Sequence, residues 1–196
     1  MRLIVGITGA TGSIFGVRVL EVLREAGIET HLVMSKWGAR TLAHETSCTL
    51  DYVKGLATCT YSETDQGAAI SSGSFVTDGM IVAPCSVRTL GAIAHGQGDN
   101  LIHRAADVVL KERRKLLLMV REAPLSEIHL ENMLKLSRMG VVIAPPMPGF
   151  YNHPQSLDDM INHVVMRALD QFGIQITLAS RWDGTMTTGG IPRAGS

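Results

Sequence analysis

The chain opens with a short apolar run, a glycine-rich turn and an amphipathic stretch, a pattern that predicts a β-strand followed by an α-helix. Residues 2–8 form the apolar run, and residues 9–13, Gly-Ala-Thr-Gly-Ser, form the turn. Apolar positions then recur at helical spacing over residues 14–26, and Gly27 is a suitable helix stop. Residues 30–35 predict a second strand, so the beginning of the chain forms one β-α-β unit.

The same alternation continues along the rest of the chain. Continuous apolar runs predict strands buried on both faces, and amphipathic stretches predict helices. The further helices are expected at residues 36–45, 86–95, 100–112, 126–139 and 156–172, and the further strands at residues 79–84, 115–120 and 141–144. Residues 46–77 predict loops and short elements. This order predicts a three-layer α/β/α fold in a single domain, with a parallel sheet of flavodoxin-like or Rossmann-like type.

Composition adds limits rather than new elements. The chain has 196 residues, 45% hydrophobic and 18% charged, which suits one domain with a full core. Lys plus Arg and Asp plus Glu both number 18, so the net charge is zero. The excess of basic residues that is typical of nucleic-acid-binding proteins is therefore absent from the sequence. Short apolar runs and the lack of a signal-peptide pattern predict a cytoplasmic protein. Three cysteines without C-x-x-C spacing, and histidines without metal-ligand spacing, predict neither disulfides nor a bound metal.

The glycine-rich turn at residues 9–13 is a candidate cradle for a nucleotide phosphate because it leads into a helix N-terminus. Glycines let the backbone approach a ligand, and the free amides and the helix dipole favour an anion. Short-chain NAD(P) reductases have a similar glycine spacing, but they need a Tyr-x-x-x-Lys pair that no tyrosine of this chain forms. The second strand also lacks the acidic residue that would bind a ribose. A tight turn without a ligand is the alternative.

Charged and hydroxyl residues follow several of the predicted strands. A buried strand ends at Arg121 and Glu122, and ligands of open α/β sheets gather beyond the carboxyl ends of the strands. We expect Lys111, near the end of the preceding helix, to add a second cation to the same rim. Ser35 and Ser86 end two other strands and suit a phosphate-bearing cofactor, although Ser86 can also be only a helix N-cap. An exposed ion pair is the alternative for Arg121 and Glu122.

Several segments together resemble the flavin prenyltransferases of the UbiX type. They are ITGATGSIFG, the Ser35-Lys36 pair, the PCS of residues 84–86, the block NLIHRAADVVLKERRKLLLMVREAPLSEIHLENMLKLSRMG and the segment PPMPGFYNHP. The resemblance spans nearly the whole chain. It implies a metal-independent enzyme that joins the dimethylallyl group of dimethylallyl monophosphate to reduced FMN, giving prenylated FMN for a UbiD-type decarboxylase. It also implies a homo-oligomer, a dodecamer, in which residues 1–183 are the flavin-binding domain. Residues 184–196 carry little pattern and are expected to form a loose tail.

The resemblance further implies roles for individual residues. The residues expected to bind FMN are Gly9, Ala10, Thr11, Ser35, Ser86, Val87, Arg88, Thr89 and Arg121. Those expected to bind the allylic phosphate are Arg104, Lys111, Arg121, Tyr151 and Arg167. The expected catalytic residues are Thr11, Glu45, Lys111, Glu122 and Trp182. Thr11 stands where many members of the family carry Ser, which keeps the hydroxyl and adds a methyl group.

The residue types suit this chemistry. An allylic phosphate leaves only if its growing negative charge is neutralised, which cations and a tyrosine hydroxyl can do without a metal. A flavin face and Trp182 offer a π-rich enclosure for the developing allyl cation. Glu122 is the expected source of a proton, with Glu45 and the departing phosphate as further participants. Tyr151 and Arg167 are expected to reach the site of a neighbouring subunit.

Two other functions stay open on the sequence alone. FMN-dependent decarboxylases of peptidyl or pantothenoyl cysteine share the flavin pattern but carry a P-x-M-N-x-x-M-W segment. Residues 146–151 here read Pro-Met-Pro-Gly-Phe-Tyr, without the Asn. A non-catalytic flavin-binding subunit of a decarboxylase system would need the flavin loops but not the cations. For Trp182, ordinary core packing is the alternative.

Overall fold

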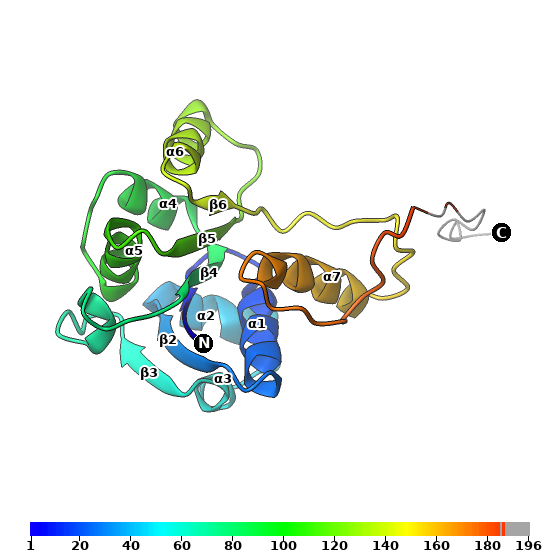
Figure 1. Cartoon of the computed structure of the whole chain (residues 1–196), viewed down its shortest axis with the longest axis horizontal. Coiled ribbons are helices and arrows are strands. Elements are labelled where there is room, and N and C mark those ends of the chain that lie inside the picture. The colour runs from blue at the N-terminus through cyan, green and yellow to red at the C-terminus, as the bar shows by residue number, and fades with distance from the viewer. Residues whose placement is uncertain (185, 187–196) are drawn as a thin grey trace. The chain divides into compact units, whose positions relative to one another are not determined.

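The computed structural model describes residues 1–184 and residue 186, and the chain divides into two compact units, residues 1–145 and residues 146–196. The first unit contains a β-sheet with helices, and the described part of the second contains the helix α7 (Leu157–Asp170) and long loops (Figure 1). The predicted tail, residues 184–196, lies almost entirely outside the described residues.

Six parallel strands form the sheet of the first unit, all of whose residues are described. They are β1 (Arg2–Ile7), β2 (Glu29–Met34), β3 (Cys59–Ser62), β4 (Gly79–Cys85), β5 (Lys115–Val120) and β6 (Val142–Ile143). The order across the sheet is β3-β2-β1-β4-β5-β6. The chain therefore winds outward from β1 to β3, returns to pair β4 with β1, and winds outward again to β6. In such sheets ligands bind beyond the carboxyl ends of the strands, where the winding direction reverses.

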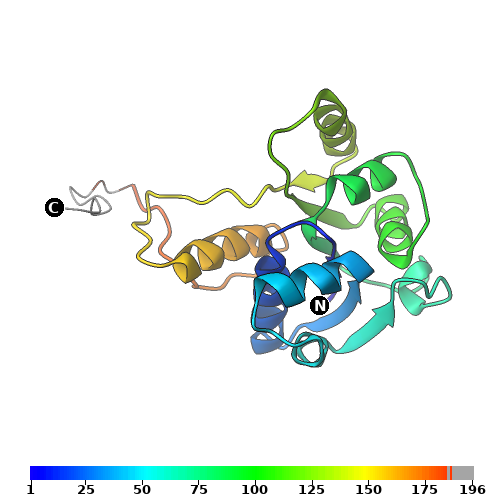
Figure 2. The same cartoon turned by 180° about the vertical axis from the view of Figure 1, so that it is seen from behind.

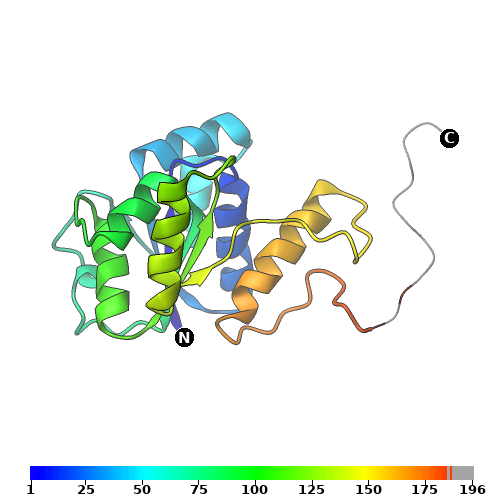
Figure 3. The same cartoon turned by 90° about the horizontal axis from the view of Figure 1, so that it is seen from above.

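Helices cover both faces of this sheet. One face carries α1 (Ser13–Glu25) with α2 (Lys36–Glu45) and α3 (Leu50–Leu56), which Figure 2 shows in blue and cyan beside the first strands. The other carries α4 (Val87–Ala94), α5 (Leu101–Lys111), α6 (Glu127–Arg138) and the 3₁₀ helix η1 (Ala69–Ser71). Figure 3 shows the green helices α4 to α6 on the opposite side of the strands from α1. The predicted three-layer α/β/α fold is confirmed.

The core beneath α4 and α5 holds the strand ends in place. Ile4, Val82 and Leu118 project from three neighbouring strands and pack with Leu90 of α4 and Ile102 of α5. All five side chains are buried. Removing such a side chain to Ala costs about 2–5 kcal/mol, because interiors are packed as densely as crystals. The loops that leave these strands therefore start from a rigid platform.

The predicted helix starts at Ser126 and Ser156 are confirmed. Each serine accepts a hydrogen bond from the backbone N–H three residues later, and the residue at that position, His129 or Asp159, bonds back to the serine backbone. Residues 46–77, expected to hold loops and short elements, contain α3, β3 and η1. The sequence did not single out β3 as a strand because this edge strand is four residues long and mostly exposed, so it lacks an apolar run.

No helix among the described residues has the length and apolar character needed to cross a membrane.

Candidate functional site

The loops that follow β1, β2, β4 and β5 meet at one edge of the sheet, which we call the carboxyl edge (Figure 1). Backbone and side-chain hydrogen bonds tie these strand ends together. Thr8 Oγ1 donates to the carbonyl of Pro84 and accepts from the N–H of Ser86, both at 2.8 Å. The N–H of Arg121 donates to the carbonyl of Cys85 at 3.0 Å. The carboxyl edge thus brings together the segments that the resemblance assigns to FMN: residues 9–11, 35, 86–89 and 121.

Ser35 and Ser86 are N-caps of α2 and α4. Ser35 Oγ accepts from the N–H of Gly38 at 3.0 Å, and Ser86 Oγ accepts from the N–H of Thr89 at 3.3 Å. Because the Ser35 oxygen accepts in this bond, its hydroxyl proton is left to donate to an anion. The helix dipoles of α2 and α4 place partial positive charge at the same edge. The capping interpretation of Ser86 is therefore confirmed, and Ser35 caps α2 in the same way. The Ser86 hydroxyl donates to Oγ1 of Thr89 at 3.2 Å.

The backbone of the glycine-rich turn is held closely by its neighbours. A Cβ atom on Gly9 would lie 2.5 Å from the Cβ of Trp37, so only glycine fits where the turn meets α2. Gly12 has a φ of 94°, in the left-handed region that glycine adopts most readily. Trp37 itself is 60% exposed at this edge.

Glu45, at the end of α2, occupies the hydrogen-bond donors of that turn. Its Oε2 accepts from the N–H of Gly12 at 2.9 Å and from the N–H and hydroxyl of Ser13 at 3.0 and 2.8 Å. Burial raises the pKa of Glu45, but hydrogen bonds from Thr11, Ser13 and Gly12 outweigh it and hold the pKa below its usual value. The turn predicted to cradle a phosphate is thus occupied by a carboxylate. Ionised Glu45 can accept a proton here, but it has none to donate at neutral pH.

Lys111 lies at the opposite end of β5 from Arg121. Helix α5 ends at Lys111 and the chain enters β5 at Lys115, whereas Arg121 follows the last residue of that strand. Six strand residues at about 3.3 Å each separate the two ends by roughly 20 Å. Lys111 pairs with Glu112, next to Gly73 in the loop that precedes β4. The expectation that Lys111 shares the rim of Arg121 is therefore wrong within one chain, because a helix preceding a parallel strand ends at that strand's amino end.

Arg104 lies on the same helix as Lys111, seven residues earlier and so on nearly the same face. Its Nε donates to the carbonyl of Ser71 in η1 at 3.1 Å, and its Nη1 pairs with Asp107 at 2.8 Å. The two cations of α5 therefore lie on one face of the helix, on the η1 side of the first unit.

Glu122, the expected proton donor, follows Arg121 at the carboxyl edge and is exposed. Its Oε1 accepts from the N–H of Ala123 at 3.1 Å. The predicted position of Arg121 and Glu122, just beyond the end of a buried strand, is confirmed.

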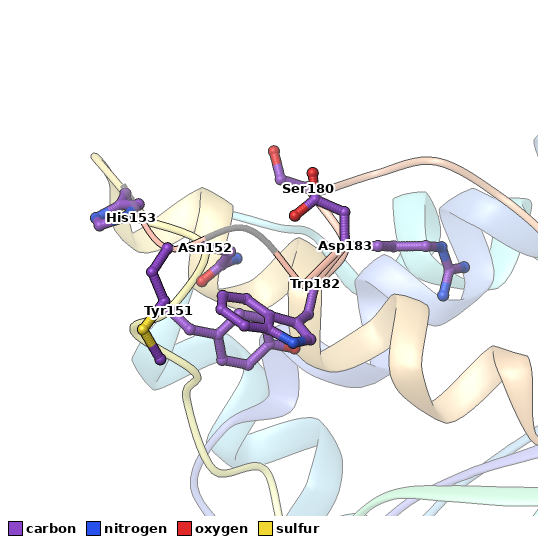
Figure 4. Close-up of a pocket in the computed structure, with 8 residues that line it drawn as sticks. Tyr151, Asn152, His153, Ser180, Trp182 and Asp183 are labelled. Atoms are coloured by element: carbon purple, nitrogen blue, oxygen red, sulfur yellow. The ribbon is translucent and has the colours of Figure 1, made fainter. Parts of the chain in front are cut away.

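The second unit contains a pocket of about 290 Å³, which we call the aromatic pocket. Its lining residues are Tyr151, His163, Met166, Arg167, Arg181 and Trp182. The Tyr151 hydroxyl lies 2.7 Å from Nε2 of His163, and the Tyr151 and Trp182 rings meet edge to face with centroids 6.0 Å apart. Figure 4 shows these last two rings side by side in an adjoining hollow that Asn152 and Ser180 also line. Trp182 is 51% exposed, so ordinary core packing does not account for it.

Asp170 holds the two arginines of the aromatic pocket. Its carboxylate accepts from Arg181 at 2.7 and 2.8 Å and from Arg167 at 2.9 Å. The hydrogen bond from Arg181 is the main reason that the pKa of Asp170 lies below its usual value. Two guanidinium groups against one carboxylate leave the cluster with net positive charge. Such a cluster suits an anionic group next to the aromatic rings.

Sequence reasoning singled out Tyr151, Arg167 and Trp182 but missed His163 and Asp170. The spacing on α7 carries the missing signal: His163 precedes Arg167 by four residues and Asp170 follows it by three, so the three share one helix face. A histidine and an arginine four residues apart on an otherwise apolar helix face would have indicated these residues.

Comparison with known proteins supports the resemblance. Residues 1–169 match the protein family described as Flavoprotein. A probable UbiX-like flavin prenyltransferase of Bacillus subtilis is 62% identical over 184 residues, which cover 94% of this chain and 90% of the relative. The crystal structure of a dodecameric FMN-dependent UbiX-like decarboxylase from Escherichia coli O157:H7 is 59% identical, with a TM-score of 0.92 over 94% of this chain and 100% of the other. That of AnUbiX (PadA1), in complex with FMN and dimethylallyl pyrophosphate, is 50% identical, with a TM-score of 0.93 over 94% and 98%.

Proposed function

Because the chain belongs to the Flavoprotein family and matches named flavin prenyltransferases over nearly its whole length, we propose that it joins the dimethylallyl group of dimethylallyl monophosphate to reduced FMN. Its product is prenylated FMN, the cofactor of a UbiD-type decarboxylase. The observation that carries this proposal is the carboxyl edge, where the four loops assigned to a flavin meet, together with the positively charged aromatic pocket.

At the carboxyl edge, the chain's own groups would hold FMN in two parts. The Ser35 hydroxyl and the amides that open α4 after Ser86 suit the phosphate, because Glu45 already occupies the donors of Gly12 and Ser13 in the glycine-rich turn. Gly9 and Ala10 let the backbone lie against the flavin ring. Arg121, exposed at the end of β5, would bind the flavin next to the reacting group. When bound, FMN supplies the ring atoms that accept the allyl group.

The chemistry breaks the bond between the allyl carbon and the phosphate oxygen. Arg167 and the hydroxyl of Tyr151 are proposed to bind that phosphate, with Lys111, Arg104 and Arg121 adding positive charge as the oxygen leaves. Trp182, half-exposed beside Tyr151, would cover the developing allyl cation and exclude water. No step requires a metal.

Glu122 is proposed as the group that delivers a proton. It is exposed at the carboxyl edge beside Arg121, where a substrate would meet it. Glu45 is proposed to act as an acceptor that orients Thr11 and Ser13, since its lowered pKa keeps it ionised.

A site that uses both Lys111 and Arg121 has to combine residues of different chains. In one chain the two side chains leave opposite ends of a six-residue strand. We therefore propose a homo-oligomer, a dodecamer as in the E. coli relative, whose sites lie between subunits. Tyr151 and Arg167 are proposed to serve a neighbouring subunit in the same way.

We place the protein in the cytoplasm. Cys48, Cys59 and Cys85 are all free, which suits a reducing compartment.

Mass spectrometry of the flavin provides the test. Purified protein is incubated with reduced FMN and dimethylallyl monophosphate, and the flavin is then weighed. The proposal expects the added mass of one prenyl unit. Bound FMN of unchanged mass would point to a non-catalytic flavin-binding subunit, and release of carbon dioxide from a peptidyl or pantothenoyl cysteine would point to a cysteine decarboxylase.

A further inference from the structure

His163 is buried on α7 and contacts the hydroxyl of Tyr151, which lines the aromatic pocket. The side chain is 6% exposed, and its Nε2 lies 2.7 Å from the Tyr151 hydroxyl. The two rings meet edge to face with centroids 5.3 Å apart. Gly149 passes over both rings so closely that a Cβ there would lie 3.1 Å from each. The pair is therefore fixed by packing as well as by the hydrogen bond.

The other ring nitrogen of His163 has no hydrogen-bond partner. Nδ1 is buried and unpaired within the described part of the chain. A neutral imidazole carries one N–H and one bare nitrogen, and a buried N–H is rarely left without an acceptor. The bare nitrogen is therefore assigned to Nδ1, and the proton to Nε2. In this tautomer His163 donates to the oxygen of Tyr151.

The charges around the ring favour this neutral form. Burial lowers the pKa of His163, and the neighbouring Arg167 and Arg181 lower it further, while Asp170 alone raises it. A neutral histidine with its proton on Nε2 leaves the Tyr151 hydroxyl only one role. Its oxygen accepts from His163, so its own proton is directed elsewhere in the pocket.

We propose that His163 is a positioning residue, which holds the Tyr151 hydroxyl as a donor toward the phosphate of the allylic substrate. This rests on the proposed function and adds a residue to it. Without His163 the hydroxyl can rotate or donate to another acceptor, and the phosphate then loses a hydrogen bond of defined direction. Arg167, four residues along the same helix face, is the proposed partner of the same phosphate.

The test compares His163→Leu, which fills much of the same space without a hydrogen-bonding group, with His163→Gln, whose amide N–H can replace that of Nε2. In His163→Leu the KM for dimethylallyl monophosphate rises about fivefold, as for the loss of one net hydrogen bond, while the KM for reduced FMN stays unchanged. In His163→Gln it stays within about twofold of wild type. Calorimetric titration of dimethylallyl monophosphate into each protein shows the same ranking without turnover.

Two controls separate positioning from a purely structural role. In a Tyr151→Phe background, His163→Leu adds no further loss, because the hydroxyl it positions is absent. Val165→Ala, a buried change on the same helix, lowers stability without removing a hydrogen bond and leaves both KM values unchanged. Equal affinity in wild type and His163→Leu, or an equal loss in the Tyr151→Phe background, would overturn the inference. Wild-type protein that adds no prenyl mass to FMN refutes the proposed function instead, while the titrations still decide the role of His163.

Discussion

Chains that each lack one of two cations should restore activity to one another. Lys111→Ala removes a cation at the amino end of β5, and Arg121→Ala removes one at its carboxyl end, roughly 20 Å away in the same chain. Suppose that one site takes Lys111 from one subunit and Arg121 from another. Random assembly of equal amounts of the two variants then leaves both cations in place in ~1/2 × 1/2, or about a quarter, of the sites. Each variant alone keeps none intact.

The assay is co-expression of the two variants with different affinity tags. Tandem purification isolates mixed oligomers, mass spectrometry gives the subunit ratio, and prenyl transfer to FMN is measured per chain. As a matched control, wild type is co-expressed with the double variant Lys111→Ala/Arg121→Ala: about a quarter of full activity indicates shared sites, and about a half indicates self-sufficient chains. Mixed oligomers of the single variants with no more activity than either variant alone would refute the reasoning.

Three further predictions concern stability and flavin binding. Gly9→Ala should weaken FMN binding, because its Cβ would lie 2.5 Å from the Cβ of Trp37; the change in FMN fluorescence as the protein is titrated in measures it, and Gly55→Ala, with nothing within 4 Å, should bind FMN normally. Glu45→Ala should lower the free energy of unfolding by about 1–2 kcal/mol, since three donors at the start of α1 lose their acceptor; urea denaturation that shows no change contradicts this. The folded-state pKa of Asp170 is lowered, so its ionised form stabilises the protein above its unfolded pKa, and this share is lost as pH falls below about 4. Asp170→Asn should therefore flatten the acid side of a plot of melting temperature against pH, and an unaltered slope would count against the ion pairs.

The alternation of apolar runs and helical patterns was enough to predict the layers of the fold. Buried strands such as Gly79–Cys85 are continuous apolar runs, and side-chain caps such as Ser156 mark helix starts, so both signals are local. Strand β3 was not predicted, because an exposed edge strand of four residues has no continuous apolar run. The division into two units at Pro145 was not predicted either, because the strand and helix patterns on its two sides predict a single domain.

In the candidate site, features that depend on neighbouring residues could be predicted from the sequence, whereas contacts between distant residues could not. Arg121 could be placed because a strand end is a local feature. Lys111 was placed wrongly because its distance in sequence, ten residues, hides a strand that separates the two side chains. Glu45 was predicted to be a catalytic residue. Its hydrogen bond from Gly12 was not predicted, because the two residues lie far apart in the chain. The pairing of His163 with a tyrosine twelve residues earlier likewise depends on how a loop folds back.

The placement of cations at both ends of β5 also bears on what dilution would do to this protein. The loops assigned to the flavin all belong to the first unit of a single chain, so a dissociated subunit keeps the means to hold FMN. If sites are shared between subunits as proposed, it loses the second cation, which another copy would supply. Flavin retention and turnover should therefore separate as concentration falls: turnover disappears at the concentration where subunits part, and the released chains act as a reserve of bound flavin that regains activity on reassembly.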